Sequence, residues 1–242
     1  MKAYISKVTS VSKSLNSADD FKEWSINPVL PASDITIDTS MIPPMLRRRC
    51  SNISKIALSM CLPILETVDI QAGVFCSQHG ELSNTVDIFQ DLTNNEIVSP
   101  NKFSQCVHNT ASGLLSVHKK IQIPFNSIAA GVDTFQMGII EAFSQNAEYD
   151  NILFSIFDDV IPDAYDNLEI SFNIEYGVSF IISKNKIFDD SKLIDISLDN
   201  NSTNFEYNHI PPALKFIDWF LSSEAVLTIP ALKITKSGVH DD

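Results

Sequence analysis

The sequence has few of the residues and patterns that mark common functional sites. Its 242 residues include only 7 glycines, and neither a GxGxxG nor a GxxxxGK[ST] phosphate loop occurs. Its 4 cysteines contain no CxxC pair, and its 5 histidines lack metal-ligand spacing, so we expect no metal site and no cofactor. A GxSxG sequence is also missing. These absences exclude the usual signatures of nucleotide-binding, zinc-binding and serine-hydrolase sites.

Positive charge and long apolar runs are also scarce. The chain has 17 Lys and Arg against 30 Asp and Glu, and this net charge of −13 repels nucleic-acid phosphates, so no nucleic-acid partner is expected. No apolar run approaches the roughly 18 residues of a membrane span. The N-terminus, MKAYISKVTSVSKSL, interleaves polar residues and is unlike a signal peptide. We therefore expect a cytoplasmic protein with reduced cysteines and no membrane span.

The order of strand and helix patterns predicts an α/β fold. Strand patterns occur at 3–11, 70–76, 125–130, 152–157, 170–182, 193–198 and 225–234. Helical patterns begin at Ser17 and after Pro44 (a stripe of Met45, Ile53, Ile56, Ala57 and Met60) and span 82–92, 103–119, 134–145 and 211–221. Without an internal repeat or a low-complexity linker, we expect one domain over 1–242. It would have a core at 1–157 and an extension at 158–242.

The most informative stretch is residues 125–142, FNSIAAGVDTFQMGIIEA. An apolar strand ends in a small-residue turn that feeds directly into a helix. In catalytic α/β proteins a nucleophile stands at such a turn, where the helix dipole and free N–H groups stabilise an anion. Here the position is held by Val132, which can neither attack nor donate nor accept a proton. The sequence therefore predicts a nucleophile elbow without its nucleophile.

Other residues suggest chemistry more weakly. Cys106 and His108 lie two apart in a helical pattern and would point to different faces, which argues against a Cys–His pair. His79 follows a strand in a glycine-containing loop, where it could serve a site or fix the loop by a hydrogen bond. The acidic run that begins at Asp158 is explained by a solvated turn at least as well as by an acid–base pair. A stand-alone acyl-processing enzyme that uses Cys106 or His79 remains an alternative.

Several stretches resemble the β-ketoacyl synthases, which are thiolase-like condensing enzymes. The resemblance runs through Ser99–Pro100, CVHN at 106–109, ASG at 111–113 and SIAAGV at 127–132, and it puts Val132 on the position of the family's catalytic cysteine. A shorter subgroup is more similar still: the chain-length-factor proteins that accompany active ketosynthases in type II polyketide systems, particularly aryl polyene clusters. That similarity adds IPPMLRRR (42–49), SQHGE (77–81), DDVIPDAY (158–165) and PPALKFIDWFL (211–221).

The resemblance implies one thiolase-like half: a three-layer α/β fold with a mixed five-stranded sheet, helices on both faces, and a C-terminal strand and helix extension. The second half, which supplies the family's catalytic histidines, has no counterpart here, so the implied role is a non-catalytic subunit without catalytic residues. It would form a heterodimer with a full-length ketosynthase and shape the tunnel for a polyene chain. The residues implied at the partner interface or tunnel end are Lys102, Phe103, Cys106, Val107, Ala130, Val132, Phe135 and Gln136.

Acyl carrier proteins are acidic, so a chain of charge −13 offers them a poor docking surface. We therefore expect the carrier to contact this chain only indirectly, through the ketosynthase. A homodimeric scaffold without a ketosynthase is a further alternative.

Overall fold

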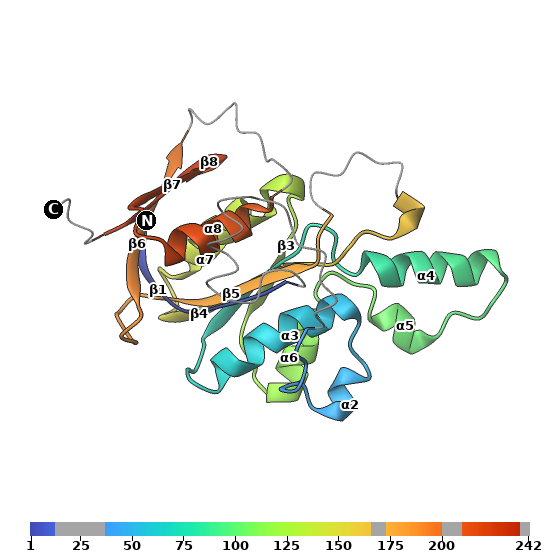
Figure 1. The fold of residues 1–242 in the computed structure, drawn as a ribbon. Coiled ribbons are helices and arrows are strands. Elements are labelled where there is room, and N and C mark those ends of the chain that lie inside the picture. The colour runs from blue at the N-terminus through green and yellow to red at the C-terminus, as the bar shows by residue number, and fades with distance from the viewer. Residues whose placement is uncertain (13–36, 166–172, 200–209, 238–242) are drawn as a thin grey trace.

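The computed structural model describes residues 1–12, 37–165, 173–199 and 210–237. In this part of the chain, one eight-stranded sheet has the order β3-β2-β4-β5-β1-β6-β8-β7 (Figure 1). The strands are β1 (Lys2–Ser12), β2 (Ala72–Cys76), β3 (Phe125–Ile128), β4 (Asn151–Asp158), β5 (Tyr176–Ser183), β6 (Lys192–Asp199), β7 (Val226–Ile229) and β8 (Ala231–Lys236). β2 runs parallel to β3 and β4, and the remaining pairs are antiparallel.

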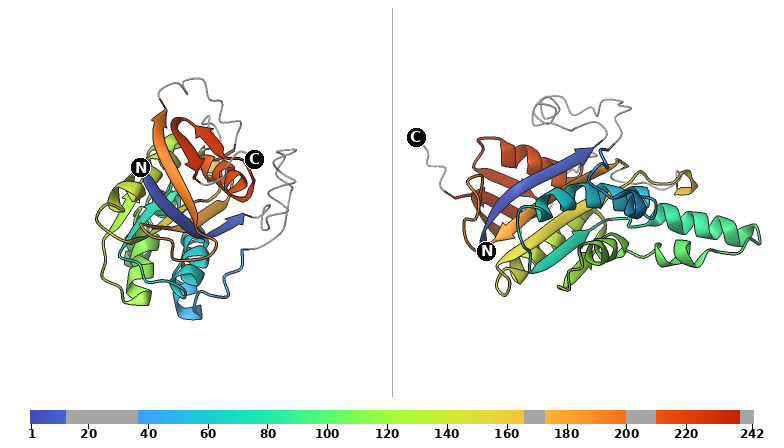
Figure 2. Two further views of the ribbon diagram at one scale, coloured as in Figure 1. Left: turned by 90° about the vertical axis from the view of Figure 1, so that its left-hand side faces the viewer. Right: turned by 90° about the horizontal axis from the view of Figure 1, so that it is seen from below.

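Helices cover both faces of this sheet, so the fold has three layers. Figure 1 shows α7 and α8 on one face and α3 and α6 on the other. The helices are α2 (Pro44–Arg47), α3 (Asn52–Leu65), α4 (Leu82–Thr93), α5 (Pro100–Ser104), α6 (Thr110–Lys119), α7 (Thr134–Gln145) and α8 (Pro212–Leu221), with short 3₁₀ turns η1 (Gly131–Asp133) and η2 (Asp163–Tyr165). α4 and α5 form an arm that projects away from the sheet, as Figure 1 and the right-hand view of Figure 2 show.

Alternating side chains of the strands build the two cores. On β2, Val74 and Cys76 pack toward α7 and α8, whereas Phe75 packs toward α3 and α6. On β4 and β5, Phe154 and Phe180 stack with ring centroids 4.7 Å apart, and Phe216 of α8 lies against Phe180. This period of two is the expected signature of a sheet covered on both faces.

The predicted thiolase-like α/β fold is confirmed, and the sheet is larger than expected. Strands β3, β2, β4, β5 and β1 are five contiguous strands of mixed direction, as predicted, and β6, β8 and β7 extend the same sheet. The single domain over 1–242 remains a prediction. β5 follows residue 158 in sequence but lies between β4 and β1, so the expected extension of 158–242 contributes a central strand.

Some predicted elements are divided differently in the structure. The helix expected at 103–119 is interrupted at 105–109. There Gln105 O accepts from Asn84 Nδ2 of α4 at 3.3 Å, and Val107 O accepts from Thr110 Oγ1 at 2.7 Å. The strand expected at 225–234 is the hairpin β7–β8, which turns at Pro230 and continues through Ala231 at φ 62°. Met45 lies on α2, is 83% exposed and does not join the buried stripe of α3.

The helix expected from Ser17 and the start of the strand expected at 170–182 lie outside the described residues. Among the helices of the described residues, none is both long and apolar enough to cross a bilayer.

Candidate functional site

β3 leads through a tight turn directly into α7, the strand–turn–helix order that a nucleophile elbow also has. Gly131 has φ +58°, a left-handed conformation that glycine adopts without steric cost. Thr134 fixes the turn, because its hydroxyl donates to Gly131 O at 2.6 Å and accepts from Ala130 N at 3.0 Å. Val132 stands in η1 at the start of α7 with its side chain half-buried. The turn thus presents an inert branched side chain at the N-terminus of a helix.

None of the four cysteines lies in the turn between β3 and α7. Burial raises the pKa of Cys50 and Cys61 to about 11. Burial, together with the charges of Asp158 and Glu141, also raises the pKa of Cys76 well above its usual value. Half-buried Cys106 donates its S–H to Phe103 O at 2.9 Å. Because a thiolate is the reactive form, the three buried cysteines are poor nucleophiles.

A buried carboxylate organises the loop at 77–81, beside the ends of β2 and β4. The Asp158 carboxylate accepts from Ser77 Oγ at 2.7 Å, from the backbone N–H groups of Gln78 and His79 at 3.2 and 3.1 Å, and from Tyr176 Oη at 3.3 Å. Asp158 is only 5% exposed, so the solvated turn expected for it is wrong. Burial raises the pKa of Asp158, and its hydrogen bonds oppose this shift.

A second buried carboxylate closes the same loop. Glu81 accepts from the hydroxyls of Ser51 and Ser54 at 2.8 and 2.7 Å and from Asn84 Nδ2 at 2.9 Å. Burial raises its pKa. The two carboxylates bind hydroxyl, amide and backbone donors, an arrangement that holds a loop in place.

The histidines support this loop and do not form a catalytic pair with Cys106. His108 Nε2 lies 2.8 Å from Ser77 O, and its ring packs over Gly80. His79 donates its backbone N–H to Asp158, while its buried Nε2 has no hydrogen-bond partner among the described residues. Cys106 is tied to the carbonyl of Phe103, and no interaction joins it to His79 in the described part of the chain.

The residues predicted for an interface or tunnel end divide into three groups. Phe103 and Val107 are 64% and 47% exposed, and Lys102 of α5 pairs with Asp91 of α4 at 2.7 Å. Cys106, Ala130 and Val132 are half-buried. Phe135 packs in the core against Phe154, and Gln136 is fully buried, so neither reaches the surface of this chain. Strand β3, expected to be buried, is half-exposed because it is an edge strand.

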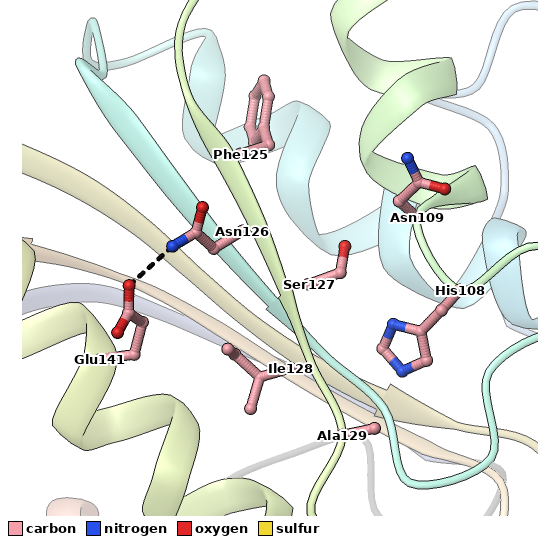
Figure 3. Close-up of a pocket in the computed structure, with 8 residues that line it drawn as sticks. All are labelled: His108, Asn109, Phe125, Asn126, Ser127, Ile128, Ala129 and Glu141. Carbon is pink, nitrogen blue, oxygen red and sulfur yellow. Dashed lines mark hydrogen bonds between the residues drawn. The ribbon is translucent and has the colours of Figure 1, made fainter.

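A groove of about 740 Å³ follows this edge (Figure 3). It is lined by His108, Asn109, Glu141 and the residues of 125–129. Pro124 O and Ile128 O accept from Gly73 N and Ser77 N of the neighbouring β2 segment. Since alternate residues direct their backbone groups to the same side, the N–H and C=O groups of 125, 127 and 129 point outward. In the described residues, no strand pairs with them.

Within the described residues, no group of three or more His, Cys, Asp or Glu side chains could hold a metal ion.

The chain matches solved structures of ketosynthase-type proteins. A chain in the complex of the ketosynthase ApeO with its chain length factor ApeC from Xenorhabdus doucetiae is 25% identical, with a TM-score of 0.83, 98% of this chain covered and 99% of that one. The ishigamide ketosynthase/chain length factor matches at 14% identity and a TM-score of 0.61, over 84% of this chain and 69% of that one. A β-ketoacyl synthase from Burkholderia phymatum STM815 matches at 12% identity and a TM-score of 0.59, over 84% and 66%. The last two likenesses show the fold alone.

No curated protein matches the sequence. The family model described as the N-terminal domain of β-ketoacyl synthase matches residues 21–233, which is most of the chain. The chain therefore belongs to the β-ketoacyl synthase N-terminal domain family.

Proposed function

We propose that this chain is a non-catalytic chain-length-factor subunit. It pairs with a full-length ketosynthase in the cytoplasm, shapes the acyl tunnel of the pair and acts in type II polyketide biosynthesis of the aryl polyene kind. The ketosynthase supplies the condensation chemistry and the main docking surface for the acyl carrier protein. Val132 carries this proposal, because it occupies the turn where the family resemblance puts the catalytic cysteine.

The chemistry around Val132 supports an inactive subunit. A hydrocarbon side chain cannot carry an acyl group, and the buried thiols have raised pKa values. The match to the ApeO–ApeC complex is further support. It covers nearly all of both chains, so the matched chain has almost the length of this one.

Two neighbouring features offer a surface for the ketosynthase. The outer edge of β3 leaves backbone groups at 125, 127 and 129 ready to pair with another strand. The arm of α4 and α5 exposes large apolar side chains, namely Phe89, Leu92, Ile97, Phe103 and Val107. His108 and Asn109, which follow the arm, line the same groove as β3, so the two features are continuous. Such an edge and such apolar side chains are stable in water when a partner covers them.

The half-buried Ala130 and Val132 follow this edge directly, where the chain turns into α7. In the paired state their side chains would border the end of the acyl tunnel. Phe135 and Gln136 would act only indirectly, by fixing the first turn of α7 from within the core.

Co-expression with each full-length ketosynthase of the same genome, followed by size-exclusion chromatography, tests the pairing. We expect one ketosynthase to co-elute with this chain at equal stoichiometry. Phe103→Asp should abolish co-elution, because it puts a charge into the apolar arm surface. Leu198→Asp is the matched control: Leu198 is 71% exposed on β6, away from β3 in the sheet order, and its substitution should leave the pair intact.

The isolated chain should turn over no acyl thioester. Turnover that is lost in Cys106→Ala would establish the stand-alone enzyme instead. A stable homodimer that ignores every ketosynthase would establish the scaffold.

A further inference from the structure

An acceptor-rich cluster lies on the α7 side of the β3 edge. It consists of Glu141 and Gln145 of α7 and Asn126 of β3. Glu141 Oε1 accepts from Asn126 Nδ2 at 2.6 Å and from Gln145 Nε2 at 2.8 Å (Figure 3 shows the first bond). Both amide groups thus donate to one carboxylate oxygen, Oε1. The acceptor atoms that remain are Glu141 Oε2 and Gln145 Oε1.

The remaining acceptors lack partners in the described part of the chain. Gln145 Oε1 is a buried atom without a hydrogen bond, and no bond or ion pair is found there for Glu141 Oε2. Glu141 lines the groove, where an incoming side chain can reach it. Of the two, only Glu141 lines the groove, and a carboxylate with a free oxygen at the wall of an open groove fits a Lys or Arg side chain.

We propose that this cluster receives a Lys or Arg side chain of the ketosynthase. The resulting ion pair favours binding of the ketosynthase over binding of a second copy of this chain. This inference rests on the proposed function. If a strand of the ketosynthase pairs with β3, every second side chain of that strand lies on the same face as Asn126 and Ile128. Directly opposite side chains on the two strands are then about 5 Å apart. A long cationic side chain at that position spans the remaining gap to Glu141.

The same cluster disfavours self-pairing. The backbone edge of β3 would accept another copy of β3 as readily as a strand of the ketosynthase, so the backbone alone gives no selectivity. A two-fold pairing of β3 with itself brings Glu141 of both copies to one seam. Two carboxylates then lie along the same seam, with no added cation between them, in a chain whose net charge is already −13. Repulsion against the wrong partner is an established source of specificity.

The opposite side of β3 provides an internal contrast. There the groove is lined by His108, Asn109 and Ser127, and the buried Ser127 Oγ has no partner among the described residues. Among the described residues that line the groove on this side, none is Asp, Glu, Lys or Arg. Contacts on it can add hydrogen bonds and packing, but they contribute little to the salt dependence of association.

The test uses the full chain and the ketosynthase that co-elutes with it. We expect Glu141→Gln to weaken the Kd at about 0.05 M NaCl by about tenfold or more, and to flatten its dependence on salt up to about 0.5 M. The glutamine can still accept from Asn126 and Gln145, so the monomer should fold, as circular dichroism and Tm would verify. Glu148→Gln removes the same charge just after α7 and should leave the Kd unchanged. Ser127→Ala should leave the salt dependence unchanged.

Sedimentation of the chain alone gives the second measurement. Glu141→Gln should self-associate more strongly than the wild type, because the repulsion at the seam is gone. If the wild type binds a ketosynthase and Glu141→Gln has the same Kd and salt dependence, the cluster is not a selective site and only this inference is wrong. If the wild type binds no ketosynthase, the proposed function itself is wrong.

Discussion

Substitution of Gly138 tests how α7 is held against the sheet beneath the turn that carries Val132. A Cβ at Gly138 would overlap Cys76 Sγ and lie 3.1 Å from Cε2 of the Phe154 ring. Non-bonded heavy atoms normally lie about 3.5–4.0 Å apart, so α7 or β2 must shift. Overpacking of this kind costs about 1–3 kcal/mol, whereas alanine gains about 1 kcal/mol over glycine in a helix. Because Cys76 and Phe154 are both fully buried and cannot move into open space, we expect a cost near the upper end, about 3 kcal/mol, so that Gly138→Ala loses about 2 kcal/mol of unfolding free energy after the helix gain.

Urea unfolding of four variants separates the two effects. Gly113→Ala on α6 is the matched control, because its Cβ would meet no described atom within 4 Å, and it should gain about 0.5–1 kcal/mol. Cys76→Ala removes the obstructing sulfur, so the double variant with Gly138→Ala should be more stable than the sum of the single changes predicts, by about 1 kcal/mol or more. A Gly138→Ala variant as stable as Gly113→Ala, or strict additivity with Cys76→Ala, would refute the packing argument.

Two further predictions concern the turn and the loop. Val132→Cys places a thiol at the helix N-terminus without supplying a base, so the isolated chain should still form no carbon–carbon bond from acyl and malonyl thioesters; measured condensation would contradict the assignment of chemistry to the partner. Asp158→Asn turns an amide N–H₂ toward donors such as the Ser77 hydroxyl and should lose about 2–4 kcal/mol of unfolding free energy. Burial raises the folded pKa of Asp158 above its unfolded value, so the stability linked to its protonation is fully present below the unfolded pKa and is lost as pH rises through the folded pKa. The difference between wild type and Asp158→Asn should therefore narrow as pH rises above about 4, the unfolded pKa of an aspartate, and a difference that stays constant would contradict the raised pKa.

Much of the fold follows from local patterns of sequence. The alternation of apolar residues in β1, the largely apolar run of β4, the helical stripe of α7 and the small-residue turn at Gly131 are all encoded within a few neighbouring residues. Each was therefore predictable from periodicity or from the conformational preference of one residue. The inert Val132 at the turn was predictable in the same way.

The features that the sequence did not reveal depend on contacts between distant residues. Gln105 and Val107 carry no helix-breaking side chain, yet the structure interrupts the helix there, and Gln105 O bonds Asn84, 21 residues away in the sequence. The sequence around Asp158 is typical of a solvated turn, but in the fold Ser77 and Tyr176 lie beside its carboxylate and donate hydrogen bonds to it. The acceptor cluster at Glu141 likewise forms only because α7 lies beside the edge of β3. No local pattern in the sequence predicts that arrangement.

The position of β1 has a consequence for how the chain is made on the ribosome. Tyr4 pairs with Ser183, and Ala3 pairs with Ile194, so the first strand has no sheet neighbour until the later strands are synthesised. At about 5–20 residues per second, β1 waits roughly 10 to 35 s for β5 to appear. Contacts so distant in sequence also slow the folding step itself. During that interval a nascent chain carries an unpaired apolar strand, which makes it a natural client for ribosome-associated chaperones.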